Sequence, residues 1–279
     1  MAPPPVVLTT DFGLSDPYAG VMKGVVLSIN PAATLIDLTH DIQPQNIRQG
    51  SFVLSASRRF FPPRSIHVAV VDPGVGTDRM AVLLVTPKAS FLAPDNGLLS
   101  GVLKEYLVTP PPDSSRVPLP PSLTAYQLTN SEYWLHPVSN TFHGRDIFSP
   151  VAAHLSLGIP PGAFGQPIQD LTWLPTPTPT RENDSLTGEV IYADHYGNLV
   201  TNIPLEELAN GAEIIVEIKG RKIAGLSKTF QSPVSSGDEG LLALGGSLGF
   251  LEVAVQNGSA AALLNTGPGE KVRVSNTRH

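Results

Sequence analysis

The sequence has no cysteine, no long apolar run and no excess of basic residues. Without cysteine the chain cannot form disulfides, use a thiolate nucleophile or bind a metal through sulfur. Its 18 Lys and Arg against 24 Asp and Glu give a net charge of −6, opposite in sign to a nucleic-acid-binding surface. No apolar run approaches the roughly 20 residues that span a bilayer, and the N-terminal segment lacks the features of a signal peptide. We therefore expect a cytoplasmic protein that binds neither nucleic acid nor membrane.

The first hundred residues alternate between β-branched segments and amphipathic ones. Helical spacing of apolar residues predicts two helices, at 17–29 and 46–60. Asp16 is expected to cap the first of them, with Pro17 as its first residue. Runs of β-branched residues predict strands at 6–10, 34–38, 66–71, 81–86 and a short one ending at 93. This alternation predicts an α/β N-terminal domain with a mostly parallel sheet.

Proline, with 28 residues, gathers in two segments. Segment 109–122 has too few backbone donors for helices or sheets, so it predicts a surface insertion without regular structure. Segment 174–184, which begins LPTPTPT, predicts an extended linker after an N-terminal domain of residues 1–173. Beyond it, alternating apolar residues between glycine and asparagine turns predict a smaller all-β, barrel-like domain at 185–279.

Three predicted strands end close to an aspartate, namely Asp11, Asp72 and Asp95. If these strands share one parallel sheet, their carboxyl ends gather three carboxylates around a crevice, where α/β sheets bind ligands. Such a site favours a polar or cationic substrate. Seven residues after Asp72 stands Arg79, and glycines between them allow the chain to fold back and pair the two. The alternative is a structural ion pair that braces a loop.

His143 lies beside a glycine, just ahead of Asp146, which is expected to cap the following helix. A loop histidine in this setting is a candidate for chemistry, although a single histidine is more commonly structural. Turn chemistry alone also explains the segments Pro94–Gly97 and Asp194–Asn198. The chain has no P-loop, no full dinucleotide-binding glycine motif and no HExxH. A magnesium site made of carboxylates remains open.

Seven segments, taken together, resemble the S-adenosyl-L-methionine (SAM) hydroxide adenosyltransferases, which are related to the fluorinases and chlorinases. They are TTDFGLSDPYAGVMKGVV, LIDLTHDI, HVAVVDPGVGTDR, APDNGLLSGVL, NTFHGRDIFSPVAAHL, GEVIYADHYGNLVTNI and GGSLGFLEVAVQNGSAA. The resemblance runs from about residue 6 to the C-terminus, apart from 109–122. It implies hydrolysis of SAM to adenosine and L-methionine by attack of water at the ribose C5′, without metal or cofactor. It also implies a homotrimer with active sites at subunit interfaces.

The resemblance assigns roles to individual residues. Asp72, Arg79 and His143 match the catalytic set, and Asp11 matches the ribose-binding acid. The expected substrate-binding residues are Asp11, Asp95, Asn96, Asp194, Tyr196, Asn198, Ser247, Glu252 and Ala254. The halogenases have a tyrosine at the position of Asp72, a threonine at that of Val75 and an extra loop. These differences favour water over a halide as the nucleophile of this protein. A halogenase, a non-catalytic SAM or adenosine sensor and a magnesium-dependent hydrolase are the alternatives.

Overall fold

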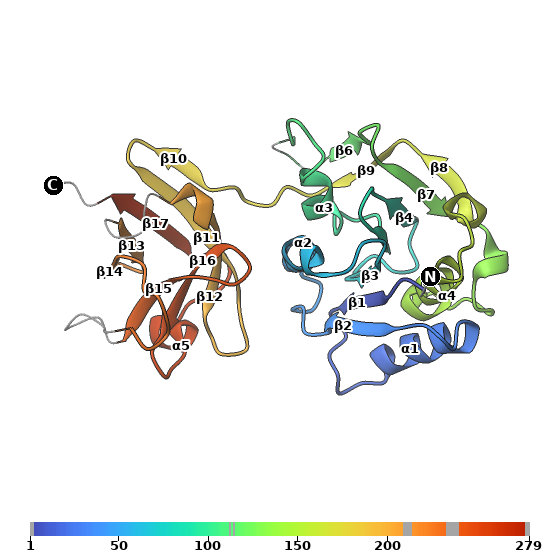
Figure 1. The fold of residues 1–279 in the computed structure, drawn as a ribbon, viewed down its shortest axis with the longest axis horizontal. Helices are drawn as coiled ribbons and strands as arrows, with labels where there is room; N and C mark the ends of the chain where they lie inside the picture. The colour runs from blue at the N-terminus through green and yellow to red at the C-terminus, as the bar shows by residue number, and fades with distance from the viewer. Residues whose placement is uncertain (1–2, 112, 114, 209–213, 233–239, 277–279) are drawn as a thin grey trace. The chain divides into compact units, whose positions relative to one another are not determined.

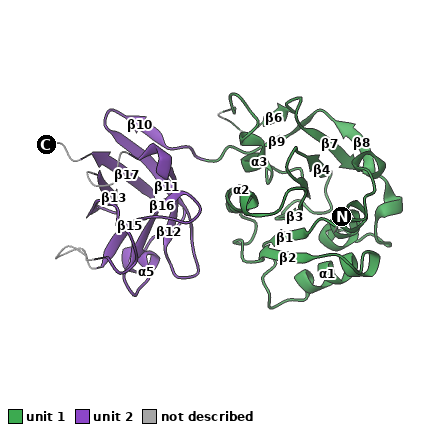
Figure 2. Cartoon of the chain, in the orientation of Figure 1, with its two compact units in different colours: residues 1–176 green, residues 177–279 purple. Residues whose placement is uncertain are grey.

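The computed structural model describes residues 3–111, 113, 115–208, 214–232 and 240–276. The chain divides into two compact units, residues 1–176 and 177–279 (Figures 1 and 2). Each unit has its own hydrophobic core. Among the described residues, no helix is both long enough and apolar enough to cross a membrane.

The first unit is built on a seven-stranded sheet of order β2-β1-β3-β5-β4-β7-β8. Its strands are β1 (Val6–Thr10), β2 (Leu35–Thr39), β3 (Ile66–Val70), β4 (Ala81–Val85), β5 (Ser90–Pro94), β7 (Thr124–Leu128) and β8 (Gly165–Ile168). The first four strands of that order run parallel, and the other three continue the sheet antiparallel. The predicted α/β class is confirmed. The sheet is mixed because the β4–β5 connection is too short for a parallel crossover.

Helices cover both faces of this sheet (Figure 1). α1 (Tyr18–Ile29) and α4 (Ser149–Ser156) pack on one face, and α2 (Ile47–Ser57) and α3 (Ser100–Lys104) pack on the other. Four short helical turns connect these elements: η1 (Arg58–Phe60), η2 (Ser131–Tyr133), η3 (Gly144–Phe148, a π-helical turn) and η4 (Pro161–Phe164). Along β3 and the residue after it, Val68 and Val70 face the α1–α4 side, whereas Ala69 and Val71 face the α2–α3 side. The pleat therefore places alternate side chains of this strand on opposite faces of the sheet.

Two local predictions differ from the structure near the helix start and the linker. Pro17 is itself the N-cap residue of α1 and no side chain caps this helix, so the prediction that Asp16 caps it is wrong. Within segment 174–184, β10 (Thr180–Glu182) pairs antiparallel with β11 (Ser185–Ala193). Asn183 has a φ of 51°, and asparagine tolerates this left-handed conformation, which lets the chain turn between the two strands.

The proline-rich segment 109–122 also contains regular structure. Ser115–Pro118 form β6, which pairs antiparallel with β9 (Asp170–Trp173) in a separate two-stranded sheet. The prediction of an irregular segment is wrong because a strand in so small a sheet needs few backbone donors. Val117 anchors β6 in the core on the α2–α3 side. Pro112 and Ser114 lie outside the described residues.

The second unit is an antiparallel sheet of order β14-β13-β17-β11-β12-β16-β15, with β10 beside β11. Its strands are β11 (Ser185–Ala193), β12 (Leu199–Pro204), β13 (Ile214–Ile218), β14 (Arg221–Ala224), β15 (Leu241–Gly245), β16 (Phe250–Val255) and β17 (Lys271–Asn276), with short helices η5 (Leu205–Glu207) and α5 (Ala260–Leu264). The end strands β14 and β15 contact each other, so the sheet nearly closes. The predicted barrel-like all-β fold is confirmed.

Candidate active site

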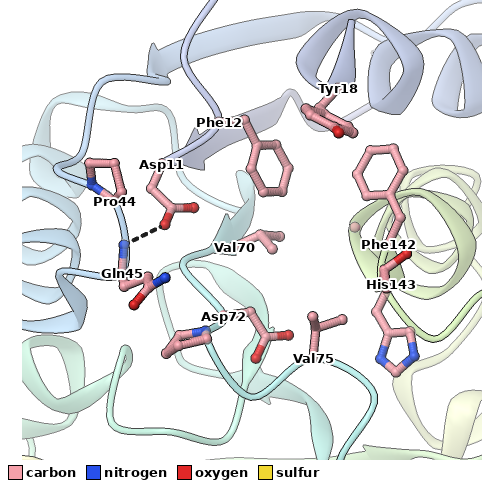
Figure 3. A pocket seen from close by; sticks show the side chains of 13 residues that line it. Asp11, Phe12, Tyr18, Pro44, Gln45, Val70, Asp72, Val75, Phe142 and His143 are labelled. Atoms are coloured by element: carbon pink, nitrogen blue, oxygen red, sulfur yellow. Dashed lines mark hydrogen bonds between the residues drawn. The ribbon is translucent and has the colours of Figure 1, made fainter. Parts of the chain in front are cut away.

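A cavity of about 430 Å³ opens at the carboxyl ends of β1 and β3, which are adjacent parallel strands. Its lining residues come from four segments that are distant in sequence: Asp11, Phe12, Tyr18, Pro44, Gln45, Val70, Asp72, Pro73, Val75, Thr141, Phe142, His143 and Gly144. In Figure 3 the aromatic rings lie in the upper part of the view, with Asp72, Val75 and His143 in the lower part. The cavity therefore has the position that α/β sheets use for ligands.

Asp72, Arg79 and His143 form one hydrogen-bonded cluster. The Arg79 Nε donates to Oδ1 and Oδ2 of Asp72 at 3.0 and 2.9 Å, and its Nη2 donates to Oδ2 as well. The same Nη2 donates to Nδ1 of His143 at 2.7 Å. The Asp72 side chain is 5% exposed and that of Arg79 is 10% exposed. Burial and the double contact make this pair far more rigid than a surface ion pair.

The loop between Asp72 and Arg79 is shaped by a close approach to the segment that carries His143. Gly76 has a φ of 78°, and a Cβ at this position would collide with the backbone carbonyl of Asn140. Only glycine meets both conditions without strain. The glycine therefore allows the two loops to pack together and brings Arg79 within reach of the imidazole.

His143 immediately precedes the π-helical turn η3, a distortion that is frequent at functional sites. Because Arg79 can only donate, Nδ1 of the neutral ring is the acceptor and Nε2 carries the proton. Burial lowers the pKa of His143, and the neighbouring guanidinium lowers it further. The prediction that Asp146 caps the next helix is wrong, because its buried carboxylate accepts hydrogen bonds from the backbone of Ser139 and from Arg145.

Asp11 faces the same cavity from the end of β1. Its Oδ2 accepts a hydrogen bond from the backbone N–H of Gln45 at 2.7 Å (Figure 3). Burial raises the pKa of Asp11, the Gln45 contact opposes this shift, and the charge of Asp72 adds to it. The carboxylate has capacity for further hydrogen bonds from a ligand.

The aromatic side chains on one side of the cavity are site residues that the sequence patterns did not predict. The rings of Phe12, Tyr18 and Phe142 contact one another, with centroids 5.2 to 5.7 Å apart. Aromatic faces attract cations as well as apolar groups. Phe12 directly follows Asp11 in the sequence, but nothing in its local pattern distinguishes it from a core residue.

Asp95 and Asn96 follow the end of β5 but do not line the cavity. Phe91 and Ala93 of β5 face the α2–α3 side, and the Asp95 carboxylate lies on that side too, against Arg116 of β6. The structure thus brings two strand-end carboxylates together, and the expectation of three around one crevice is wrong. Instead, Arg116 and the backbone N–H of Thr172 hold the Asp95 carboxylate away from the other two.

The remaining predicted site residues belong to the second unit. Asp194 accepts hydrogen bonds from the backbone N–H groups of Tyr196 and Asn198 and from the Asn198 side chain. Glu252 lies on β16, which pairs with β12. Burial raises the pKa of Glu252 and the charge of Asp194 raises it further. The structure therefore clusters these two acids.

Exposure differs among the other second-unit candidates. Tyr196 is 75% exposed and Ser247 is exposed in the β15–β16 turn, whereas Ala254 is fully buried. Near the acids, the pKa of Tyr192 is raised to about 12, first by burial and then by the charges of Glu252 and Asp194. In the part of the chain that the structure describes, no group of three or more His, Asp or Glu residues has the geometry of a metal site.

Known proteins match this chain over nearly its whole length. The SAM hydroxide adenosyltransferase N-terminal domain matches residues 6–165, and the C-terminal domain of that family matches residues 188–273. The (R)-S-adenosyl-L-methionine hydrolase of Salinispora arenicola is 36% identical over 277 residues, which cover 98% of each chain. A fluorinase of Actinopolyspora mzabensis is 25% identical over 306 residues, covering 98% of this chain and 97% of its own.

The fold is matched as well. The crystal structure of an uncharacterized conserved protein from Thermotoga maritima superposes with a TM-score of 0.84 at 35% identity, covering 97% of this chain and all of that one. Both family domains are present, in order, and each lies within one of the two units. The protein is a member of the SAM hydroxide adenosyltransferase family.

Proposed function

We propose that the protein hydrolyses SAM to adenosine and L-methionine. The observation that carries this proposal is the hydrogen-bonded Asp72–Arg79–His143 cluster at a cavity that also contains Asp11. Similarity to the S. arenicola hydrolase, whose name specifies the (R) epimer at sulfur, supports the same substrate and epimer here. Two carboxylates in one cavity suit a cationic sulfonium.

Water is the proposed nucleophile. Its oxygen forms a bond to C5′ while the C5′–S bond breaks, and the sulfur keeps the electron pair and leaves as the neutral thioether of methionine. No acid is needed for this leaving group, so the residues only hold the water in line and accept its proton. Nδ1 of His143 accepts from Arg79, which leaves Asp72 as the base. In this scheme Arg79 holds the Asp72 carboxylate, and His143 accepts a hydrogen bond from Arg79.

Asp11 is the proposed ribose ligand. A carboxylate accepts hydrogen bonds from both ribose hydroxyls, and the Gln45 backbone already orients it. We further propose a cytoplasmic homotrimer in which Asp194, Tyr196 and Asn198 of a neighbouring subunit hold the methionine end. Ser247 and Glu252 belong to the same proposed surface, and Ala254 is buried next to them on β16. Asp95 and Asn96 are proposed to act without touching substrate.

A halogenase is the second candidate, favoured by the 25% identity to the A. mzabensis fluorinase. Against it, Asp72 places a carboxylate in the cavity, and this negative charge would repel a halide in a partly dry pocket. Val75 also lines the cavity and offers no hydrogen-bond donor to a halide.

The deciding experiment is chromatography of the products from purified protein with each epimer of SAM, in EDTA and without added halide. We expect adenosine and methionine in equal amounts, and a loss of about 10²–10⁴-fold in kcat for Asp72→Ala with SAM affinity retained. Halogenated nucleoside formed on addition of chloride or fluoride would identify a halogenase. SAM that binds but stays intact would identify a sensor, and activity lost in EDTA would identify a metal-dependent hydrolase.

A further inference from the structure

Asn96 contacts the backbone next to Asp72. Its side-chain Nδ2 donates to the carbonyl of Val71 at 2.9 Å, and its Oδ1 accepts from the backbone N–H of Leu98 at 3.1 Å. Val71 is fully buried and directly precedes Asp72. The amide therefore ties the end of β3, where the proposed base begins, to the turn after β5.

Asp95 contacts the backbone next to Arg79. Its N–H donates to the carbonyl of Met80 at 2.9 Å. Adjacent residues of one turn thus hold both ends of the Asp72–Arg79 loop, Asn96 at the start and Asp95 at the finish. Rotation of this turn would move the carboxylate and the guanidinium relative to each other.

The proline-rich segment secures this turn. The Asp95 carboxylate, 3% exposed, accepts from Nη1 of Arg116 at 2.9 Å and from the backbone N–H of Thr172 at 2.7 Å. Arg116 also donates from Nε to Asp170 at 2.6 Å. Charge-assisted bonds of this kind fix a buried carboxylate more firmly than neutral ones.

We propose that Asp95 and Asn96 form a clamp that positions the Asp72–Arg79 pair, and that Arg116 braces the clamp from the proline-rich segment. Both are positioning residues, since neither lines the cavity. The inference rests on the proposed function for its kinetic consequence, because displacement of the base by about 1 Å costs on the order of 10²-fold in rate.

Asn96→Asp tests the clamp, because it removes the donor to Val71 while keeping the shape and the acceptor for Leu98. The matched control is Asn130→Asp. Asn130 donates to the Ala163 carbonyl at 3.0 Å and accepts from the Glu132 N–H at 3.2 Å, and it does not line the cavity. Steady-state kinetics with SAM should give a kcat about 10- to 100-fold lower for Asn96→Asp, with KM within about twofold. The control should keep wild-type kcat and KM.

A raised KM with unchanged kcat would make Asn96 a substrate ligand and overturn the proposal, as would wild-type kinetics or an equal loss in the control. Arg116→Gln is the second variant, and its half-exposed side chain makes it tolerable to the fold. It should lower kcat less than Asn96→Asp does, again at constant KM. Wild-type kcat in Arg116→Gln would overturn the bracing role.

A second readout separates this inference from the proposed function. The ring signals of His143, assigned with His143→Gln, are titrated by NMR in wild type and Asn96→Asp. If the clamp positions Arg79, its displacement should move the pKa of His143 up toward the ordinary value, because the guanidinium no longer lowers it. If wild type does not turn over SAM, the proposed function fails, but the titration still tests the clamp. A His143 pKa that is the same in Asn96→Asp as in wild type would overturn the clamp, and an upward shift would support it.

Discussion

Asp11 and Asp72 face one cavity from the carboxyl ends of two neighbouring parallel strands, and the charge of Asp72 contributes to the raised pKa of Asp11. Burial is the larger cause of that shift. Two acids in a partly dry cavity repel each other, and a cationic ligand relieves the repulsion. The relationship links the electrostatics of the cavity to the charge of the proposed substrate.

Asp11→Asn should weaken SAM binding more than it lowers kcat. The raised pKa also sets a pH dependence: Asp11 becomes protonated as the pH falls through a midpoint above its ordinary value of 3.8. Below that midpoint the carboxylate no longer attracts the sulfonium or accepts two hydroxyls, so kcat/KM should fall. Profiles of kcat/KM against pH check this, and the acidic limb should be absent from Asp11→Asn. A limb retained in that variant would assign it to another group.

His40 is linked by hydrogen bonds to residues at the edge of the cavity. The Phe12 N–H donates to Oγ1 of Thr10, which is 2.8 Å from Nδ1 of the buried His40, and Nε2 of His40 is 3.0 Å from Asp37. His40→Ala should destabilise the fold by about 1–3 kcal/mol, because buried partners lose their hydrogen bonds. It should also raise KM, since Asp11 lies between the two tethered residues. Thr10→Val, which removes one hydroxyl, should lower the free energy of unfolding and raise KM by less than His40→Ala does. Denaturant unfolding measures the stability of each variant, and steady-state kinetics measures its KM.

His67 makes the fold sensitive to acid. Its ring stacks on Phe91 at 5.0 Å, and in the described part of the chain neither ring nitrogen has a hydrogen-bond partner. Burial, with a smaller contribution from Arg58, lowers its pKa from 6.5 to about 4. Above pH 6.5 the ring is neutral in both states. Between 6.5 and 4 the unfolded chain binds the proton first, so up to about 3 kcal/mol of stability is lost as the pH falls.

The test is the free energy of unfolding of His67→Phe measured between pH 7 and 4. The variant should lose stability less steeply than wild type on acidification. His136→Gln, a change at an exposed histidine, is the control and should follow the wild-type curve. Parallel curves for wild type and His67→Phe would assign the acid sensitivity to the carboxylates.

Subunit mixing tests the proposed shared site. Asp72→Ala and Asp194→Ala should each be inactive alone, because each destroys one half of every site. After unfolding and co-refolding in equal amounts, a site regains activity when one subunit supplies Asp72 and its neighbour supplies Asp194. Random trimers should then recover about a quarter of the wild-type rate. No recovery, with light scattering that confirms mixed trimers, would place both residues in a site within one subunit.

Part of the site could be predicted from the local chemistry of the sequence. Asp72 and Arg79 stand on either side of a glycine-containing loop, and the structure confirms that they pair. Local chemistry does not predict contacts between segments that are distant in sequence. Arg79 meets His143 across 64 positions, and Asp95 meets Arg116 because a segment predicted to be irregular forms a strand.

By itself, the sequence determined the fold class, the strand-end position of the acids and the family, because periodicity, turn residues and motifs act over short stretches of chain. Tertiary structure alone decided which acids share a cavity. Asp72 lines the cavity with Asp11, whereas Arg116 of β6 and the backbone N–H of Thr172 in β9 hold the Asp95 carboxylate elsewhere. That choice depends on contacts with segments that are distant in sequence, which local sequence patterns do not specify.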